Sequence, residues 1–114
     1  MNLLEIKQYL ETNNITLPIS IGSLKDTDSI GLFTTGGQRP VFYFDDTMSI
    51  YEGLQIISRN ISYSECEKNI NNIFSLLNKL EGFEPQQNPF SLGRNEKGYM
   101  EFSVNYIITK EGAK

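Results

Sequence analysis

The chain has 114 residues, with 10 basic and 14 acidic side chains and a formal net charge of −4. A chain of this length forms one modest core, so residues 1–114 are expected to fold as a single domain. Mild acidity without any cluster of lysines and arginines argues against a dedicated nucleic-acid-binding protein.

Histidine is absent from the sequence, which removes the commonest general base and metal ligand. The single cysteine, Cys66, excludes an internal disulfide, and we expect the protein to be made in a reducing cytoplasm. Neither a signal peptide nor a membrane span is expected in the opening stretch MNLLEIKQYLETNN, which is too polar and too short. The composition therefore disfavours an enzyme, and we expect no catalytic residue, no metal, no cofactor and no contact with a membrane.

The first third of the chain predicts one short helix and two short strands. Residues 3–12 carry an apolar stripe with helical spacing, and Asn2 with Glu5 has the spacing of a capping pair. Residues 17–23 and 29–35 are rich in β-prone residues and are separated by a KDTD turn. The glycines that follow the second strand, Gly36 and Gly37, are expected to end it.

The middle of the chain is the hardest part to interpret. Residues 40–52 combine a β-prone aromatic run with turn residues, so they form either a hairpin or a long ordered loop. Residues 53–59 predict a central strand with Leu54, Ile56 and Ser58 on one face. Isoleucine occurs on both faces of this strand, which favours cover on both sides, at least in part.

Residues 63–81 predict a long amphipathic helix. Ser62 with Glu65, or Ser64 with Glu67, has capping-box spacing at its start, and Gly82 is the expected stop. The apolar stripe steps by three and four and is formed by Tyr63, Cys66, Ile70, Ile73, Leu77 and Leu80, widened by Phe74.

The last third predicts a hairpin. Residues 84–89 are a polar loop, and residues 90–94 and 99–109 are two strands joined by a turn. The second strand alternates strictly, and one face is formed by Met100, Phe102, Val104, Tyr106 and Ile108. Residues 110–114 are expected to be a loose tail. The fold class is therefore α+β, a mostly antiparallel sheet covered on one face by the long helix and the short N-terminal helix.

Three features of the sequence resemble chemical sites, and a simpler interpretation is favoured for each. Asp45 and Asp46, with Glu52 nearby, offer oxygen ligands for a hard cation, but a turn explains the pair better. Cys66 lies on the apolar helix stripe without a histidine to activate it, so a buried small hydrophobe is favoured over a nucleophile. The two consecutive glycines lack the lysine and serine or threonine of a phosphate-binding loop.

Surface residues suggest a protein interface instead. Aromatic side chains contribute much of the binding energy of protein interfaces. The aromatic side chains of residues 40–52 either contact a partner in this way or pack within their own domain, and the two interpretations are equally favoured. Two arginines end strands at turns, where they pair with acids across a subunit boundary or are ordinary surface residues. The candidate interface residues are Phe42, Phe44, Asp45, Asp46, Tyr51, Arg59 and Arg94.

Over residues 15–109 the chain resembles the minor capsid and tail terminator families of long-tailed bacteriophages. The resemblance is carried by the early strand pair ISIGSLKDTDSIGLFTTGG, the strand ending Ile56-Ile57-Ser58-Arg59 before the helix, the turn at Gly98, and the ending Asn105-Tyr106-Ile107. Residues 40–52 depart most from the family pattern.

The resemblance implies a structural virion protein that forms a ring, usually a hexamer, which caps the tail tube and joins it to the neck. Its partners would be copies of itself, the tail tube protein and a neck or head-completion protein, while double-stranded DNA passes through the lumen without specific binding. Neighbouring copies would meet by strand-edge pairing or loop docking. Two alternatives stay open, namely a head-completion adaptor or stopper and a small acidic protein-binding module.

Overall fold

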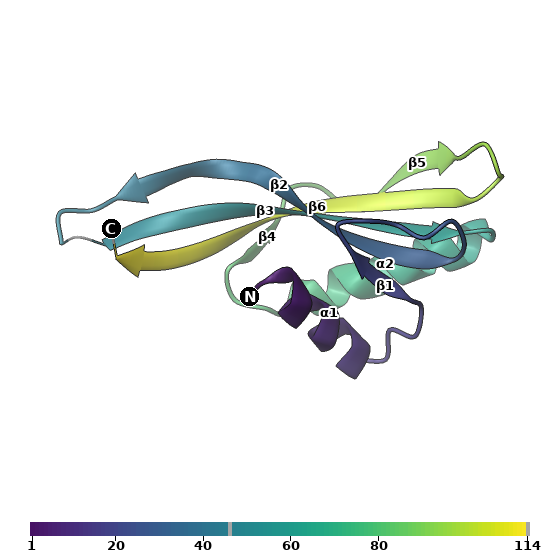
Figure 1. The fold of residues 1–114 in the computed structure, drawn as a ribbon, viewed down its shortest axis with the longest axis horizontal. Coiled ribbons are helices and arrows are strands. Elements are labelled where there is room, and N and C mark those ends of the chain that lie inside the picture. The colour runs from purple at the N-terminus through teal and green to yellow at the C-terminus, as the bar shows by residue number, and fades with distance from the viewer. Residues whose placement is uncertain (46, 114) are drawn as a thin grey trace.

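The computed structural model describes residues 1–45 and 47–113, and in this part of the chain it has two helices and one sheet, whose twist is visible in Figure 1. The elements in chain order are α1 (Leu3–Thr12), β1 (Ile19–Ile21), β2 (Ser29–Phe42), β3 (Thr47–Asn60), α2 (Tyr63–Leu77), β4 (Phe83–Pro85), β5 (Phe90–Arg94) and β6 (Met100–Ala113).

The strands form one sheet in the order β1-β2-β3-β6-β4, and β5 pairs with β6 as well. β3 is the central strand and pairs antiparallel with both β2 and β6. β1 runs parallel to β2, so the sheet is mixed and the prediction of a mostly antiparallel sheet is wrong. The physical reason is that residues 22–28 carry the chain back to the end where β1 began, and the Gly22 amide donates to the Leu32 carbonyl at 2.7 Å.

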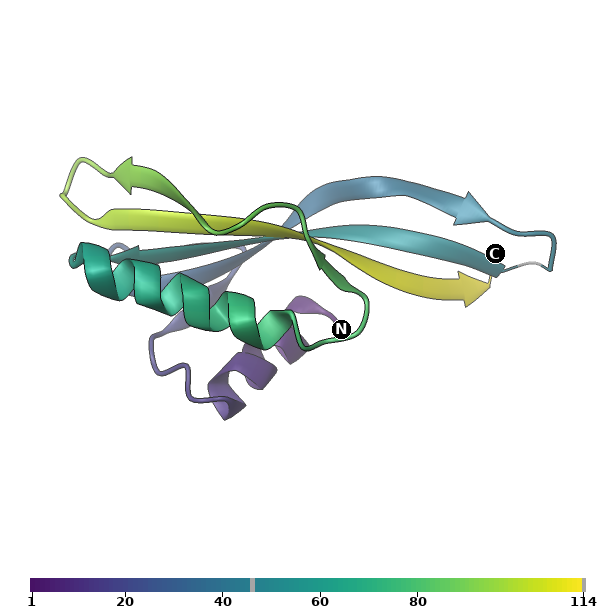
Figure 2. The same ribbon diagram turned by 180° about the vertical axis from the view of Figure 1, so that it is seen from behind.

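Both helices lie on one face of the sheet, as Figure 2 shows. The predicted faces of β3 and β6 are confirmed, because Leu54, Ile56 and the alternating apolar residues of β6 are buried against the helices. α1 has the predicted bounds, and its capping box between Asn2 and Glu5 is present. Helix α2 begins at the Ser62 cap as predicted, where the hydroxyl accepts a hydrogen bond from the Glu65 amide.

Helix α2 is shorter than the predicted span of 63–81. It ends at Leu77 with Asn78 as its C-cap, and the Leu80 amide bonds back to the Leu77 carbonyl in a tighter turn. The Asn78 side chain accepts a hydrogen bond from the Tyr106 hydroxyl at 2.7 Å, which anchors this end of the helix to the sheet. Burial raises the pKa of Tyr106, so this hydroxyl stays a donor at neutral pH.

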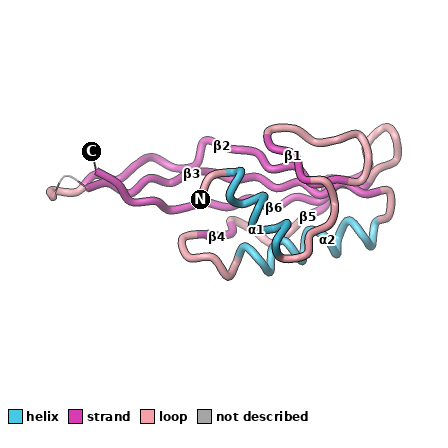
Figure 3. The backbone as a smooth tube through the Cα atoms, turned by 60° about the horizontal axis from the view of Figure 1, so that its bottom comes forward, coloured by secondary structure: helices cyan, strands magenta, loops and turns pink. Residues whose placement is uncertain are grey.

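Half of the sheet extends beyond the helices as a three-stranded arm, which gives the molecule its extents of 52 × 27 × 21 Å (Figures 1 and 3). We define the arm as residues 36–45, 47–53 and 108–113. The hairpin alternative for residues 40–52 is thereby confirmed. The predictions that Gly36-Gly37 ends the strand and that residues 110–114 are loose are wrong for the described residues, because β2 runs to Phe42 and residues 110–113 pair with β3.

Two β-bulges accommodate the glycines and the proline of β2, so that β2 stays paired with β3. The register shifts between Thr35 and Gln38, and again between Gln38 and Val41. Gly37 has φ of 63°, and a Cβ there would lie 2.1 Å from the Tyr51 carbonyl oxygen. Glycine is therefore required at this bulge both for its backbone conformation and for the close approach to β3.

We predict that Gly37→Ala lowers the free energy of unfolding of the arm by about 1–3 kcal/mol, because the methyl group meets backbone and the conformation is left-handed. Gly36→Ala is the matched control, since nothing lies within 4 Å of a Cβ there and its φ is not positive. Urea denaturation with amide hydrogen exchange in the arm measures both. Equal effects of the two variants would contradict this account of the bulge.

Candidate subunit interface at the arm tip

The tip of the arm is an exposed group of apolar and aromatic side chains. Phe44, in the turn between β2 and β3, is fully exposed, and Phe42 at the end of β2 is 58% exposed. Val41 and Tyr43 are exposed as well. Figures 1 and 2 show the helices along the other half of the sheet, so the helical layer does not cover the tip. Several exposed large apolar side chains at one end of a small protein are typical of an interaction site.

The tip is held in shape by the strands that carry it. Phe42 pairs with Met48 and Val41 pairs with Ser49 across the hairpin. The Tyr43 hydroxyl lies 3.1 Å from the Ser49 hydroxyl, within hydrogen-bond distance. The aromatic groups are thus presented on a defined hairpin, which limits the conformational entropy lost when they bind.

The long edge of β2 is poorly suited to pairing with another strand. β1 covers this edge only as far as Leu32, and the rest carries the two bulges and Pro40, which has no amide proton. Bulges and proline are common protections of exposed edge strands. Side chains, rather than backbone ladders, are therefore the better candidates for contacts on this side of the arm.

The outer edge of β6 is occupied along the body. Between β5 and β4, the Asn105 amide donates to the Gln87 side chain at 2.8 Å. The Thr109 amide donates to the Gly82 carbonyl at 2.9 Å. Only the last residues of β6, within the arm, extend past these partners.

The structure brings three of the predicted interface residues together at the tip, namely Phe42, Phe44 and the exposed Asp45. Asp46 lies outside the described residues. Tyr51 is on the arm but nearer the body, half-buried, and paired with Gln38 and Thr109. By the alternation of β3, Tyr51 faces away from the helices, whereas Phe42 lies beside Met48 on the helix side.

The two predicted arginines lie at the opposite end of the sheet from the tip. Arg59 Nε donates to Glu101 Oε2 at 2.8 Å, and Arg59 Nη1 also donates to the Lys25 carbonyl. Arg94 donates to the carbonyls of Ile61 and Gly98. Both side chains thus tie neighbouring loops of their own chain together, and a role at a subunit boundary stays a prediction.

The residues that resemble chemical sites in the sequence have ordinary structural roles. Glu52, offered with Asp45 as a cation ligand, forms an ion pair with Lys110 at 2.9 Å. Cys66 is buried, as predicted, and desolvation raises the pKa of its thiol, so the reactive thiolate is disfavoured. Within residues 1–45 and 47–113, no group of three or more potential metal ligands occurs. No helix in this part of the chain is long and apolar enough to cross a membrane.

Comparison with known proteins gives one family. The family model described as bacteriophage tail terminator protein matches residues 9–111. This range runs from within α1 almost to the end of β6 and includes the tip and the arm up to residue 111. No curated protein matches the chain.

We predict that Phe44→Ser changes the free energy of unfolding by less than about 0.5 kcal/mol, because a fully exposed side chain has no core contacts to lose. Leu54→Ala is the contrast, with an expected loss of about 2–5 kcal/mol at a fully buried position. Urea denaturation of dilute protein measures both. A loss near that of Leu54→Ala would show instead that the Phe44 ring packs within its own domain.

Proposed function

The chain belongs to the bacteriophage tail terminator family, and we propose that its copies form a closed ring that caps the tail tube and joins it to the neck of the head. The family is structural, so the protein is a virion component rather than an enzyme. A hexamer is the ring that the family resemblance implies.

The aromatic tip of the arm is the observation that supports assembly most directly. Exposing several large apolar side chains on a protein of 114 residues is unfavourable for a solitary monomer and suits a surface that is buried on association. Aromatic residues at such positions commonly supply most of the binding energy. We therefore assign Phe42 and Phe44 to the contact, with Asp45 beside them, and Tyr51 to its margin on the arm.

The shape of the molecule favours a head-to-tail contact over a symmetric dimer. Two tips meeting each other would bury only the turns, and a stable interface needs about 1,000 Å² or more. A tip that binds a different surface on the next copy makes a heterologous contact, which closes into a ring when the rotation between copies closes. A ring built in this way has a lumen, as a tail-capping protein requires.

The negative net charge of such a ring is compatible with the passage of DNA through its lumen. Each copy has a formal charge of −4, so six copies carry about −24, which discourages tight adhesion of the DNA backbone. We propose that double-stranded DNA passes without specific binding and that the protein partners are the tail tube protein on one side and a neck protein on the other.

The test mixes purified protein with tail tube subunits and measures native mass and the appearance of tube ends by electron microscopy. We predict that the wild-type chain forms rings on tube ends, whereas Phe42→Ser/Phe44→Ser stays monomeric and leaves the ends bare, because the apolar anchors are gone. Ile61→Ser is the matched control, since Ile61 is 53% exposed but lies at the far end of the body. This control should assemble like the wild type.

Two results would contradict the proposal. A wild-type chain that stays monomeric and ignores tube ends would exclude a tail terminator role. Binding to the portal side of the neck without binding to tube ends would assign the protein to head completion, as an adaptor or stopper.

A further inference from the structure

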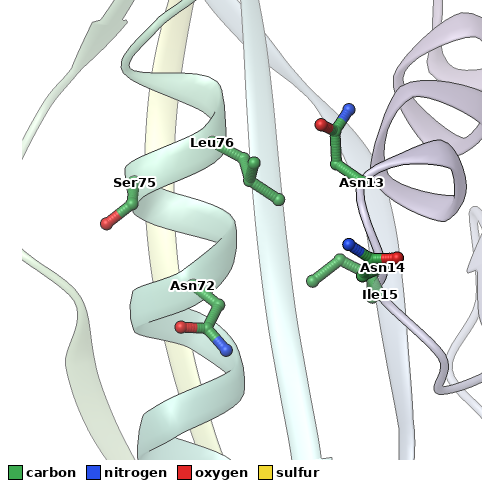
Figure 4. Close-up of a pocket in the computed structure, with 6 residues that line it drawn as sticks. All are labelled: Asn13, Asn14, Ile15, Asn72, Ser75 and Leu76. Carbon is green, nitrogen blue, oxygen red and sulfur yellow. The ribbon is translucent and has the colours of Figure 1, made fainter.

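A groove lies on the helical side of the body, far from the arm tip. It runs between α2 and the segment that follows α1, with a volume of about 250 Å³. Figure 4 shows Ile15 and Leu76 pointing toward one another across it. Its lining is formed by Asn13, Asn14, Ile15, Asn72, Ser75 and Leu76.

The chemistry of the groove suits an aromatic side chain at the end of a turn. Ile15 and Leu76 are partly buried and pack against the hydrophobic core, so the apolar part of the groove is backed by rigid structure. Around them the lining is polar but uncharged, and the side-chain amides of Asn14 and Asn72 can donate to and accept from the backbone of an incoming turn, whereas that of Asn13 donates to the Tyr9 carbonyl. An apolar centre with a neutral polar rim is the usual anatomy of an anchoring pocket.

Two lysines flank the groove on α2 and the turn that follows it. Helical spacing places Lys68 one turn before Asn72, and Lys79 lies one turn after Ser75 and Leu76, with its amide bonded to the Leu76 carbonyl. Both lysines are exposed. The arm tip carries Asp45 directly after Phe44, so a tip whose aromatic ring enters the groove brings an acidic residue toward the side of the groove that these two lysines flank.

The tip cannot fill the groove of its own chain, because the arm points away from the helices (Figures 1 and 3). A second copy supplies the matching surface, since each copy carries one tip and one groove. We propose that Phe44 of one copy docks between Ile15 and Leu76 of the next, with Asp45 facing Lys68 and Lys79. This inference rests on the ring proposed above and names the surface by which its copies meet.

Cysteine crosslinking tests the contact while leaving the aromatic anchors in place. The native Cys66 is buried, so engineered thiols are the exposed ones in the described part of the chain. The variant Asp45→Cys/Asn72→Cys places one thiol beside Phe44 and one on the groove rim. On oxidation we expect a ladder of covalent oligomers that ends at the ring size, because each copy links to the next.

Three controls define that result. Asp45→Cys alone and Asn72→Cys alone should give no species larger than a dimer, since one thiol per chain cannot extend a ladder. Asp45→Cys/Glu96→Cys, with the second thiol on the loop at the far end of the body, should give no ladder either. A ladder from this last variant that equals the groove variant would overturn the proposed docking site.

A charge exchange provides an independent measurement. Lys68→Glu/Lys79→Glu should weaken assembly of the wild-type tip about three- to tenfold in sedimentation equilibrium, because both rim charges then repel Asp45. Adding Asp45→Lys to this variant should restore most of the lost affinity between copies. Adding Asp45→Lys to the Lys97→Glu variant, whose change lies far from the groove, should not improve assembly. If adding Asp45→Lys changed assembly equally in the Lys68→Glu/Lys79→Glu variant and in the Lys97→Glu variant, the pairing would be contradicted.

The outcomes separate this inference from the proposed function. Rings of wild-type protein on tube ends, together with no ladder from Asp45→Cys/Asn72→Cys, would leave the tail terminator role standing and overturn the groove contact. A wild-type chain that assembles neither alone nor on tube ends would overturn both.

Discussion

The structure depends on the pairing of one strand, β3, with a partner on each side from one end of the molecule to the other. Its residues Thr47–Asn60 pair with Ala113–Met100 of β6 without a break in register, while β2 follows on the other side through two bulges. In the body this ladder is backed by two helices and a continuous core. In the arm the ladder and its cross-strand contacts hold the strands together without that backing. At Gly37 the backbone of β3 comes so close that a Cβ would lie 2.1 Å from the Tyr51 carbonyl oxygen.

The body could be predicted from sequence because its signals are local and periodic. The alternation of β6 and the three- and four-residue steps of α2 each select one buried face, and those faces meet in the core. Capping residues fixed the starts of both helices. The parallel direction of β1 could not be predicted, because the sequence of a three-residue strand does not indicate in which direction its partner runs.

The arm was harder to predict because its sequence contains residues that usually stop strands. Gly36, Gly37 and Pro40 read as breakers, yet tertiary pairing turns them into bulges inside a continuous strand. Residue type alone did single out Phe42 and Phe44, and their exposure on the arm is consistent with a contact role. The groove gave no signal in the sequence, because asparagine, serine, isoleucine and leucine are ordinary in helices and loops, and only the packing of α2 beside the segment after α1 brings them together.

The two bulges and Pro40, which interrupt the regular pairing of β2, are compatible with the closed assembly proposed above. A long strand with a regular open edge would accept further strands without limit, whereas the bulges and Pro40 interrupt the β2 edge. In the proposed ring the exposed aromatic group at the end of the arm would set the position of the next copy relative to the body. In the proposed ring the arm would also set the rotation between copies, and a fixed rotation is what separates a closed ring from an open filament.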